Sequence, residues 1–67
     1  METNENVRSR FQTYMSSEPA TYVRVGKAIG LNDNQSRYLL SRFAGNKQKL
    51  YPDTLSKLSD FLSARGY

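Results

Sequence analysis

Amide and basic side chains gather between residues 34 and 52. Four residues there carry hydrogen-bonding groups that fit the edges of DNA base pairs: Asn34, Gln35, Arg37 and Ser41. Asn and Gln can pair with adenine, and Arg with guanine, through two hydrogen bonds each when a helix carries them into the major groove. The same segment has four basic residues and no acidic one, a local charge of +4 that equals the net charge of the chain. This localised charge favours an acidic partner, most often nucleic acid.

The residue types that are missing exclude most other chemistry. The chain has 67 residues with neither Cys nor His, which excludes thiol nucleophiles, zinc fingers, redox pairs and histidine general bases. Six scattered carboxylates remain as general bases, and no two have a spacing that would place them on one helical face inside a cleft. We therefore expect no enzyme, no metal, no cofactor and no small-molecule substrate.

The chain has the length and composition of one small domain over residues 1–67. Leu, Ile, Val and Phe together number 14, about 21% of the residues and just above the level of about 20% below which charged chains stay disordered. A domain of this size has to rely on helix packing or association. No apolar run is long enough for a membrane span or a signal-peptide core, so we expect a soluble protein of the cytoplasm.

Apolar residues at helical spacing predict a first helix over residues 4–16. Its face carries Val7, Phe11, Tyr14 and Met15. Thr3 or Asn4 can cap its start, and Pro19 ends it by excluding the preceding residue from the helical region. Arg8 and Arg10 are expected to be exposed to solvent.

Two more helices are predicted to be joined by a tight turn. The second begins at about Ala20 or Thr21, carries the stripe Tyr22, Val25, Ala28 and Ile29, and ends at Gly30. Asn32 and Asp33 are good N-cap types that begin a third helix over 33–44. At 100° per residue this helix has an apolar arc of Leu39, Leu40, Phe43 and Ala44 and an opposite arc of Asn34, Arg37, Tyr38 and Ser41.

A last helix follows a basic loop. Gly45 and Asn46 end the third helix, Lys47 to Lys49 form the loop, and Pro52 suits a first helical position. The last helix has the apolar face Leu55, Leu58, Phe61 and Leu62 and ends at Gly66. No segment alternates with period two for long enough to predict a strand. The expected fold class is all-α, a compact bundle of four to five short helices.

Three strings of residues carry a resemblance to a known family. They are Val25-Gly26-Lys27-Ala28-Ile29-Gly30-Leu31, then Leu40-Ser41-Arg42-Phe43 with Gly45 and Lys47, and Tyr51-Pro52-Asp53-Thr54-Leu55. Together they resemble the lambda-repressor and Cro-type helix-turn-helix family over about residues 20–63. Two positions depart from the pattern. Ser36 stands where the family usually has an apolar residue, and the string Leu40-Ser41-Arg42-Phe43 comes about one helical turn late, so that either the third helix is longer or the turn contains an insertion. Tyr51 stands where a capping residue is common before the proline.

The resemblance implies a lambda-repressor-like fold and a sequence-specific regulator of transcription that binds double-stranded DNA through its third helix. It implies Asn34, Gln35 and Arg37 as the leading base-reading residues, with Tyr38 and Ser41 behind them. Phosphates would be held by Thr21, Tyr22, Arg42, Lys47 and Lys49. Family members generally bind as dimers on two half-sites. The chain would be either a minimal regulator that pairs through its last helix or C-terminal tail, with Phe61 and Tyr67 as candidates, or the DNA-binding piece of a longer chain.

Other interpretations of the same residues remain open. Arg37 and Arg42 can belong to a solvated helix face, Tyr38 can cover the rim of the core, and Lys47 and Lys49 can lack a specific role. The whole chain can also be a small module that binds a protein partner, such as another regulator or a polymerase subunit. That module would need an exposed apolar patch, for which the candidates are Val23, Leu50, Tyr51 and Phe61.

Overall fold

Four helical segments account for most of the chain in a computed structural model that describes residues 3–67. They are α1 (Asn4–Ser17), α2 (Tyr22–Ala28), a continuous run made of α3 (Asp33–Gln35), η1 (Ser36–Leu40) and α4 (Ser41–Ala44), and α5 (Pro52–Ala64). No strand is present among these described residues. The predicted all-α fold class is confirmed.

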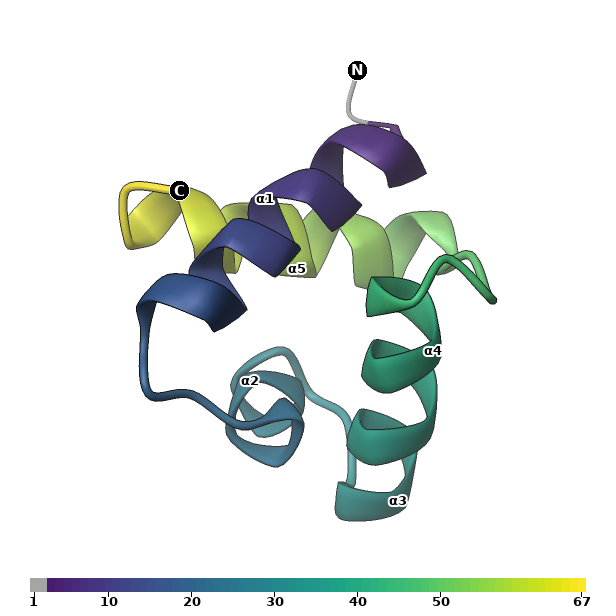
Figure 1. Cartoon of the computed structure of the whole chain (residues 1–67). Coiled ribbons are helices and arrows are strands. Elements are labelled where there is room, and N and C mark those ends of the chain that lie inside the picture. Colours follow the sequence, from purple (N-terminus) through teal and green to yellow (C-terminus); the bar gives the residue numbers. More distant parts are fainter. Residues whose placement is uncertain (1–2) are drawn as a thin grey trace.

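The helices form two pairs around a shared core (Figure 1). α1 lies across α5, while α2 packs against the run from α3 to α4, and α1 also contacts α4. In Figure 1 α2 is seen nearly end-on and the α3–α4 run lies in the plane of the view, so these two elements cross each other. Within residues 3–67 no helix is both long and apolar enough to cross a membrane.

Apolar side chains from all four segments and from the last loop make up the core. Its buried members are Val7, Phe11, Tyr14, Val25, Ile29, Leu40, Phe43, Leu50, Leu55, Leu58 and Leu62. Apart from Leu50, which lies in the loop, these residues belong to the predicted apolar faces. Five other residues of those faces are only half-buried and pack against the edge of the core: Met15, Tyr22, Leu39, Ala44 and Phe61. Ala28 was predicted to lie on the stripe of α2 and is exposed, whereas the neighbouring Gly26 is buried.

Local capping explains where the helices begin and end. Thr3 and Thr21 each accept a hydrogen bond from a backbone N–H of the first turn that follows. α2 ends in a Schellman motif, in which Leu31 N–H donates to the Gly26 carbonyl and Gly30 adopts a φ of 91°. Asn46, with a φ of 60°, has the same role after α4. The predicted helix ends at Gly30 and at Gly45-Asn46 are therefore confirmed, with Asn46 as the left-handed residue.

The prediction that Arg8 and Arg10 are exposed is wrong. Arg8 is only 9% exposed, its Nε donates to the Phe43 carbonyl at 2.9 Å, and its guanidinium lies 5.2 Å from the centre of the Phe43 ring. Arg10 is half-buried and donates to the Tyr67 carbonyl at 2.8 Å and to Ser59 Oγ at 2.8 Å. Both apolar stems cover the core while the polar heads reach acceptors on other helices.

Replacing Arg8 by alanine should therefore destabilise the fold. The substitution removes a charge-assisted hydrogen bond to the carbonyl of a buried residue, and we expect the free energy of unfolding to fall by about 2 kcal/mol. Urea unfolding followed by circular dichroism measures this change. Arg24→Ala is the matched control, because Arg24 is exposed and such changes usually stay within about 0.5 kcal/mol. Equal effects of the two substitutions would contradict the role assigned to Arg8.

Candidate nucleic-acid interface

A turn of four residues, 29–32, joins α2 to the run that begins with α3. Asn32 forms a capping box with Gln35: Asn32 Oδ1 accepts from the Gln35 N–H at 2.8 Å, and Gln35 Oε1 accepts from the Asn32 N–H at 3.2 Å. The turn and its caps thus hold the start of the run in place against α2.

The run from residue 33 to residue 44 is not a uniform α-helix. Its bounds match those of the predicted third helix. Its middle part, η1, is however a π-helical turn of five residues, which lies between the three residues of α3 and the four residues of α4. A π turn takes up an extra residue without ending a helix. The run therefore holds one residue more than a regular α-helix of the same rise.

Ser36 explains how the π turn packs against α2. It is fully buried, and its Oγ donates to the Asn32 carbonyl at 2.6 Å. A Cβ added at Gly26 would overlap the Ser36 side chain and lie 3.0 Å from Ser36 Cα. The small residue pair Gly26 and Ser36 therefore allows α2 and η1 to approach each other closely, where a larger apolar side chain would not fit.

The five predicted base-reading residues all lie on the exposed surface of this run: Asn34, Gln35, Arg37, Tyr38 and Ser41. Asn34 and Arg37 have no side-chain hydrogen bond or ion pair to any described residue, and so their polar groups are available to a ligand. Gln35 is partly engaged through its Oε1 in the capping box. Tyr38 is 59% exposed, which makes it a surface group and not a cover for the core.

The run and the loop after it also position three of the five predicted phosphate-binding residues. Arg42 is half-buried, its Nε donates to Gln48 Oε1 at 3.2 Å, and its guanidinium lies 5.2 Å from the centre of the Tyr38 ring. Lys47 and Lys49 are exposed on the loop that follows α4. The structure therefore places these three basic residues at the C-terminal end of the run.

Thr21 and Tyr22 lie elsewhere, at the start of α2. Thr21 Oγ1 accepts from the Arg24 N–H at 3.2 Å as the helix cap. The Tyr22 ring packs 6.1 Å from the Phe11 ring, and the residue is half-buried. Each has a structural role that accounts for its residue type.

Two features of the electrostatics were not predicted. Asp33, the acidic residue at the start of the run, pairs with Lys27 across the turn at 3.4 Å. The pair cancels a negative charge that would repel phosphates, although it is exposed and therefore contributes little to stability. Arg8 is buried and Arg10 is half-buried, and each donates hydrogen bonds within the fold. The basic segment 34–52 accordingly makes up a larger share of the accessible positive charge than the composition indicates.

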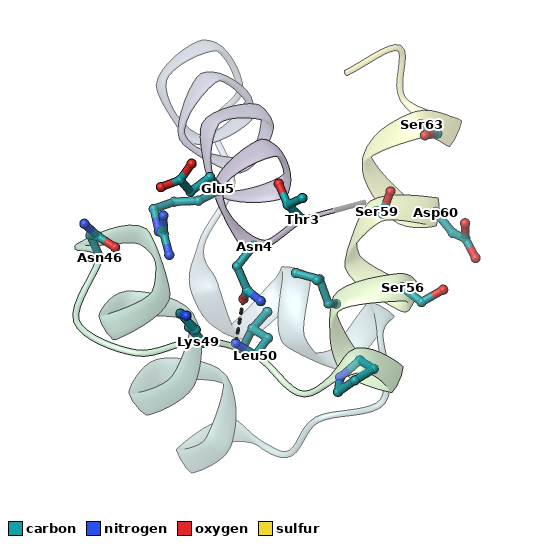
Figure 2. A pocket seen from close by; sticks show the side chains of 13 residues that line it. Thr3, Asn4, Glu5, Asn46, Lys49, Leu50, Ser56, Ser59, Asp60 and Ser63 are labelled. Atoms are coloured by element: carbon teal, nitrogen blue, oxygen red, sulfur yellow. Dashed lines mark hydrogen bonds between the residues drawn. The ribbon is translucent and has the colours of Figure 1, made fainter. Parts of the chain in front are cut away.

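A groove beside the basic loop was also not predicted (Figure 2). It lies between the N-terminal turns of α1, the loop after α4 and one side of α5. Asn46 and Lys49 line it from the loop, and Ser56, Ser59, Asp60 and Ser63 line it along α5. The Leu50 N–H donates to Asn4 Oδ1 at 2.9 Å across its floor, which ties the loop to α1. No sequence pattern brings these separated segments together.

The apolar patch expected for a protein-interaction module does not form. Leu50 belongs to the buried core, and Phe61 packs edge-on against Tyr14 at 5.5 Å and beneath the Arg65 guanidinium at 3.9 Å. Val23 is half-buried, so that of the four candidates only Tyr51 is strongly exposed, at 83%. Tyr67, a candidate for self-association, is half-buried and its Oη donates to Glu18 Oε2 at 2.9 Å, a contact that raises the pKa of Tyr67.

Three comparisons with known proteins were made. A scan against protein-family models, a search of curated proteins and a search of solved structures each find no match to this chain. The described residues contain no group of three or more acidic side chains that could hold a metal ion.

Proposed function

We propose that this chain is a sequence-specific regulator of transcription that binds double-stranded DNA as a helix-turn-helix protein. The observation that carries the proposal is the exposed face of the α3–η1–α4 run, where Asn34 and Arg37 have unengaged polar groups. The run follows a four-residue turn after α2, and residues 34–52 contain four basic and no acidic side chains. A helix with such side chains fits the major groove and the phosphates beside it.

The contacts that each side chain makes within the chain refine the proposed roles. Asn34 and Arg37 read base edges directly, with Tyr38 and Ser41 behind them, while Gln35 contributes its amide nitrogen because its oxygen serves the cap. Lys47 and Lys49 contact phosphates, and so do the terminal amino groups of Arg42, whose Nε is engaged by Gln48. Thr21 and Tyr22 are proposed as further phosphate contacts at the start of α2, in addition to the capping by Thr21 and the packing of the Tyr22 ring on Phe11.

The proposed regulator pairs as a homodimer on DNA. Among the described residues the only large apolar side chains that are exposed are Tyr38 and Tyr51, which is less than an obligate dimer interface uses. Two half-sites one helical turn apart would bring two copies together. A cytoplasmic location, in contact with the nucleoid, follows from this role.

Selection from a random pool of double-stranded DNA tests the proposal. The purified protein is mixed with the pool at two salt concentrations, and the retained DNA is sequenced. We expect an enriched motif, a palindrome with half-sites about 34 to 36 Å apart for a dimer. Salt-sensitive retention without enrichment would overturn sequence specificity, and no retention at low salt would overturn DNA binding itself.

Substitutions of Asn34 and Lys47 should separate base reading from phosphate contact. Asn34→Ala should cost about 1 to 3 kcal/mol on the selected site and relax the choice at one base pair. Lys47→Ala should weaken binding to all sequences alike and reduce the slope of log affinity against log salt by about one. Fluorescence anisotropy on selected and random duplexes measures both effects. Identical behaviour of the two variants would contradict the assignment of Asn34 as a base reader.

A further inference from the structure

Arg8 is a buried cation without a carboxylate partner. The residue is 9% exposed, and among the described residues no carboxylate oxygen lies within 4.0 Å of its guanidinium. Its Nε donates to the Phe43 carbonyl, and its terminal amino groups donate to no described acceptor. A guanidinium has five N–H donors, and a buried charge is unfavourable unless it is paired and hydrogen-bonded. Arg8 therefore has unused capacity to bind an anion.

The groove in Figure 2 gives an anion access to Arg8. Arg8 lines this groove together with Asn46 and Lys49, which Figure 2 shows on the loop side. Asn46 is held there by its left-handed conformation at the end of α4, and Lys49 is exposed. A guanidinium, an ammonium and an amide are all donors, and this set suits the several acceptor oxygens of a phosphate.

The acidic residues of the groove do not neutralise this set. Glu5 lines the groove from α1 and is exposed, and it makes no ion pair with Arg8 or Lys49. Asp60 lies on α5, across the groove from the loop. The loop end of the groove thus carries two positive charges against one solvated carboxylate.

We propose that Arg8, Asn46 and Lys49 form a phosphate-binding site, and that its ligand is a backbone phosphate of the DNA bound by the α3–η1–α4 run. That the phosphate belongs to DNA rests on the proposed function. That the site binds a phosphate rests only on the three donor side chains. The loop that carries Asn46 and Lys49 directly follows the run, so a duplex in contact with the run is close to this loop. The site adds a residue of α1 to the interface.

Nuclear magnetic resonance on the whole ¹⁵N-labelled chain tests the site. The Arg8 Nε–H signal and the Asn46 side-chain amide signal are followed during titration with inorganic phosphate and, separately, with a random-sequence duplex slightly longer than one helical turn. We expect both signals to shift in both titrations. The double variant Asn46→Gly, Lys49→Gln should lose the phosphate-induced shift and bind the duplex about tenfold more weakly. Glycine keeps the left-handed conformation at position 46, so the variant retains the helix end.

The two titrations distinguish the possible outcomes. The control Lys57→Gln removes one exposed charge on α5 and should leave both signals and the duplex affinity close to those of the natural chain. If the Arg8 and Asn46 signals shift with the duplex and do not shift with inorganic phosphate, the site is supported, with DNA as its only source of phosphate. Normal duplex binding with an unmoved Arg8 signal would overturn the site and leave the proposed function standing. Phosphate-induced shifts without any duplex binding would overturn the DNA source and the proposed function, and no response to either would overturn both.

Discussion

Gly26→Ala is expected to lower the free energy of unfolding by about 3 kcal/mol, the upper end of the usual cost of overpacking. The new Cβ would overlap the Ser36 side chain and press on Ser36 Cα at 3.0 Å. Because that atom is backbone, no rotamer change relieves the overlap, and α2 has to move away from η1. This loss exceeds the gain of about 1 kcal/mol that alanine brings to a helix interior. A chain of this length has roughly 3 to 10 kcal/mol of stability in total, so a large fraction would be lost.

Urea unfolding followed by circular dichroism measures the effect, with Gly45→Ala as the matched control. At Gly45 an added Cβ would make only ordinary contacts, the nearest at 3.5 Å, and the φ of −83° suits alanine. Gly45→Ala should therefore be neutral or slightly stabilising. Adding Ser36→Gly to Gly26→Ala removes the overlapping side chain and should restore part of the stability. A Gly26→Ala protein as stable as Gly45→Ala would show that the close approach is not needed.

Charge reversal at Arg37 is expected to weaken binding to the selected DNA site by at least about a hundredfold. The change removes a base contact worth about 1 to 3 kcal/mol and places a carboxylate against the phosphates. Arg37 is exposed and has no partner in the described part of the chain, so the fold should be unaffected. Fluorescence anisotropy at fixed salt gives the affinity, and circular dichroism checks the fold.

Lys57→Glu is the control for Arg37→Glu. Both substitutions replace an exposed cation by a carboxylate and so lower the net charge by the same amount, but Lys57 lies on α5, outside the basic segment. We expect the control to weaken binding by only a few-fold, through the long-range field. Similar losses in the two proteins would indicate that binding depends on total charge and that the α3–η1–α4 run has no special place in it.

The helices could be predicted because their signals are local. Apolar spacing, with Thr3 or Asn4 as the cap, placed the first helix over 4–16, and α1 is Asn4–Ser17 with Thr3 as its cap. Gly30 marked the end of the second helix, because a glycine that adopts the left-handed conformation commonly ends a helix. The exposed face of 33–44, with Asn34 and Arg37, followed from the same periodicity.

The features that could not be predicted depend on contacts between distant residues. Arg8 is buried where it donates to the carbonyl of Phe43, 35 positions later, and Leu50 lies in the core with its N–H donating to Asn4, 46 positions earlier. The type of a residue and its neighbours in the sequence do not indicate which distant residue it will contact. The packing of the π turn is of the same kind, since it depends on Gly26 and Ser36, which lie on different helical segments.

The π turn also affects how the chain tolerates a change of length. In an ordinary helix the loss of one residue rotates everything beyond it by about 100°, which would carry Phe43 out of the core. η1 already holds one residue more than an α-helical turn of the same rise. Removal of one exposed residue from η1, Arg37 or Tyr38, would leave a regular α-helix. The residues before and after the deletion would then keep the same sides toward the core. The loss of one residue at this point of the helix is therefore compatible with an undisturbed core, whereas the same loss in α1 or α5 is not.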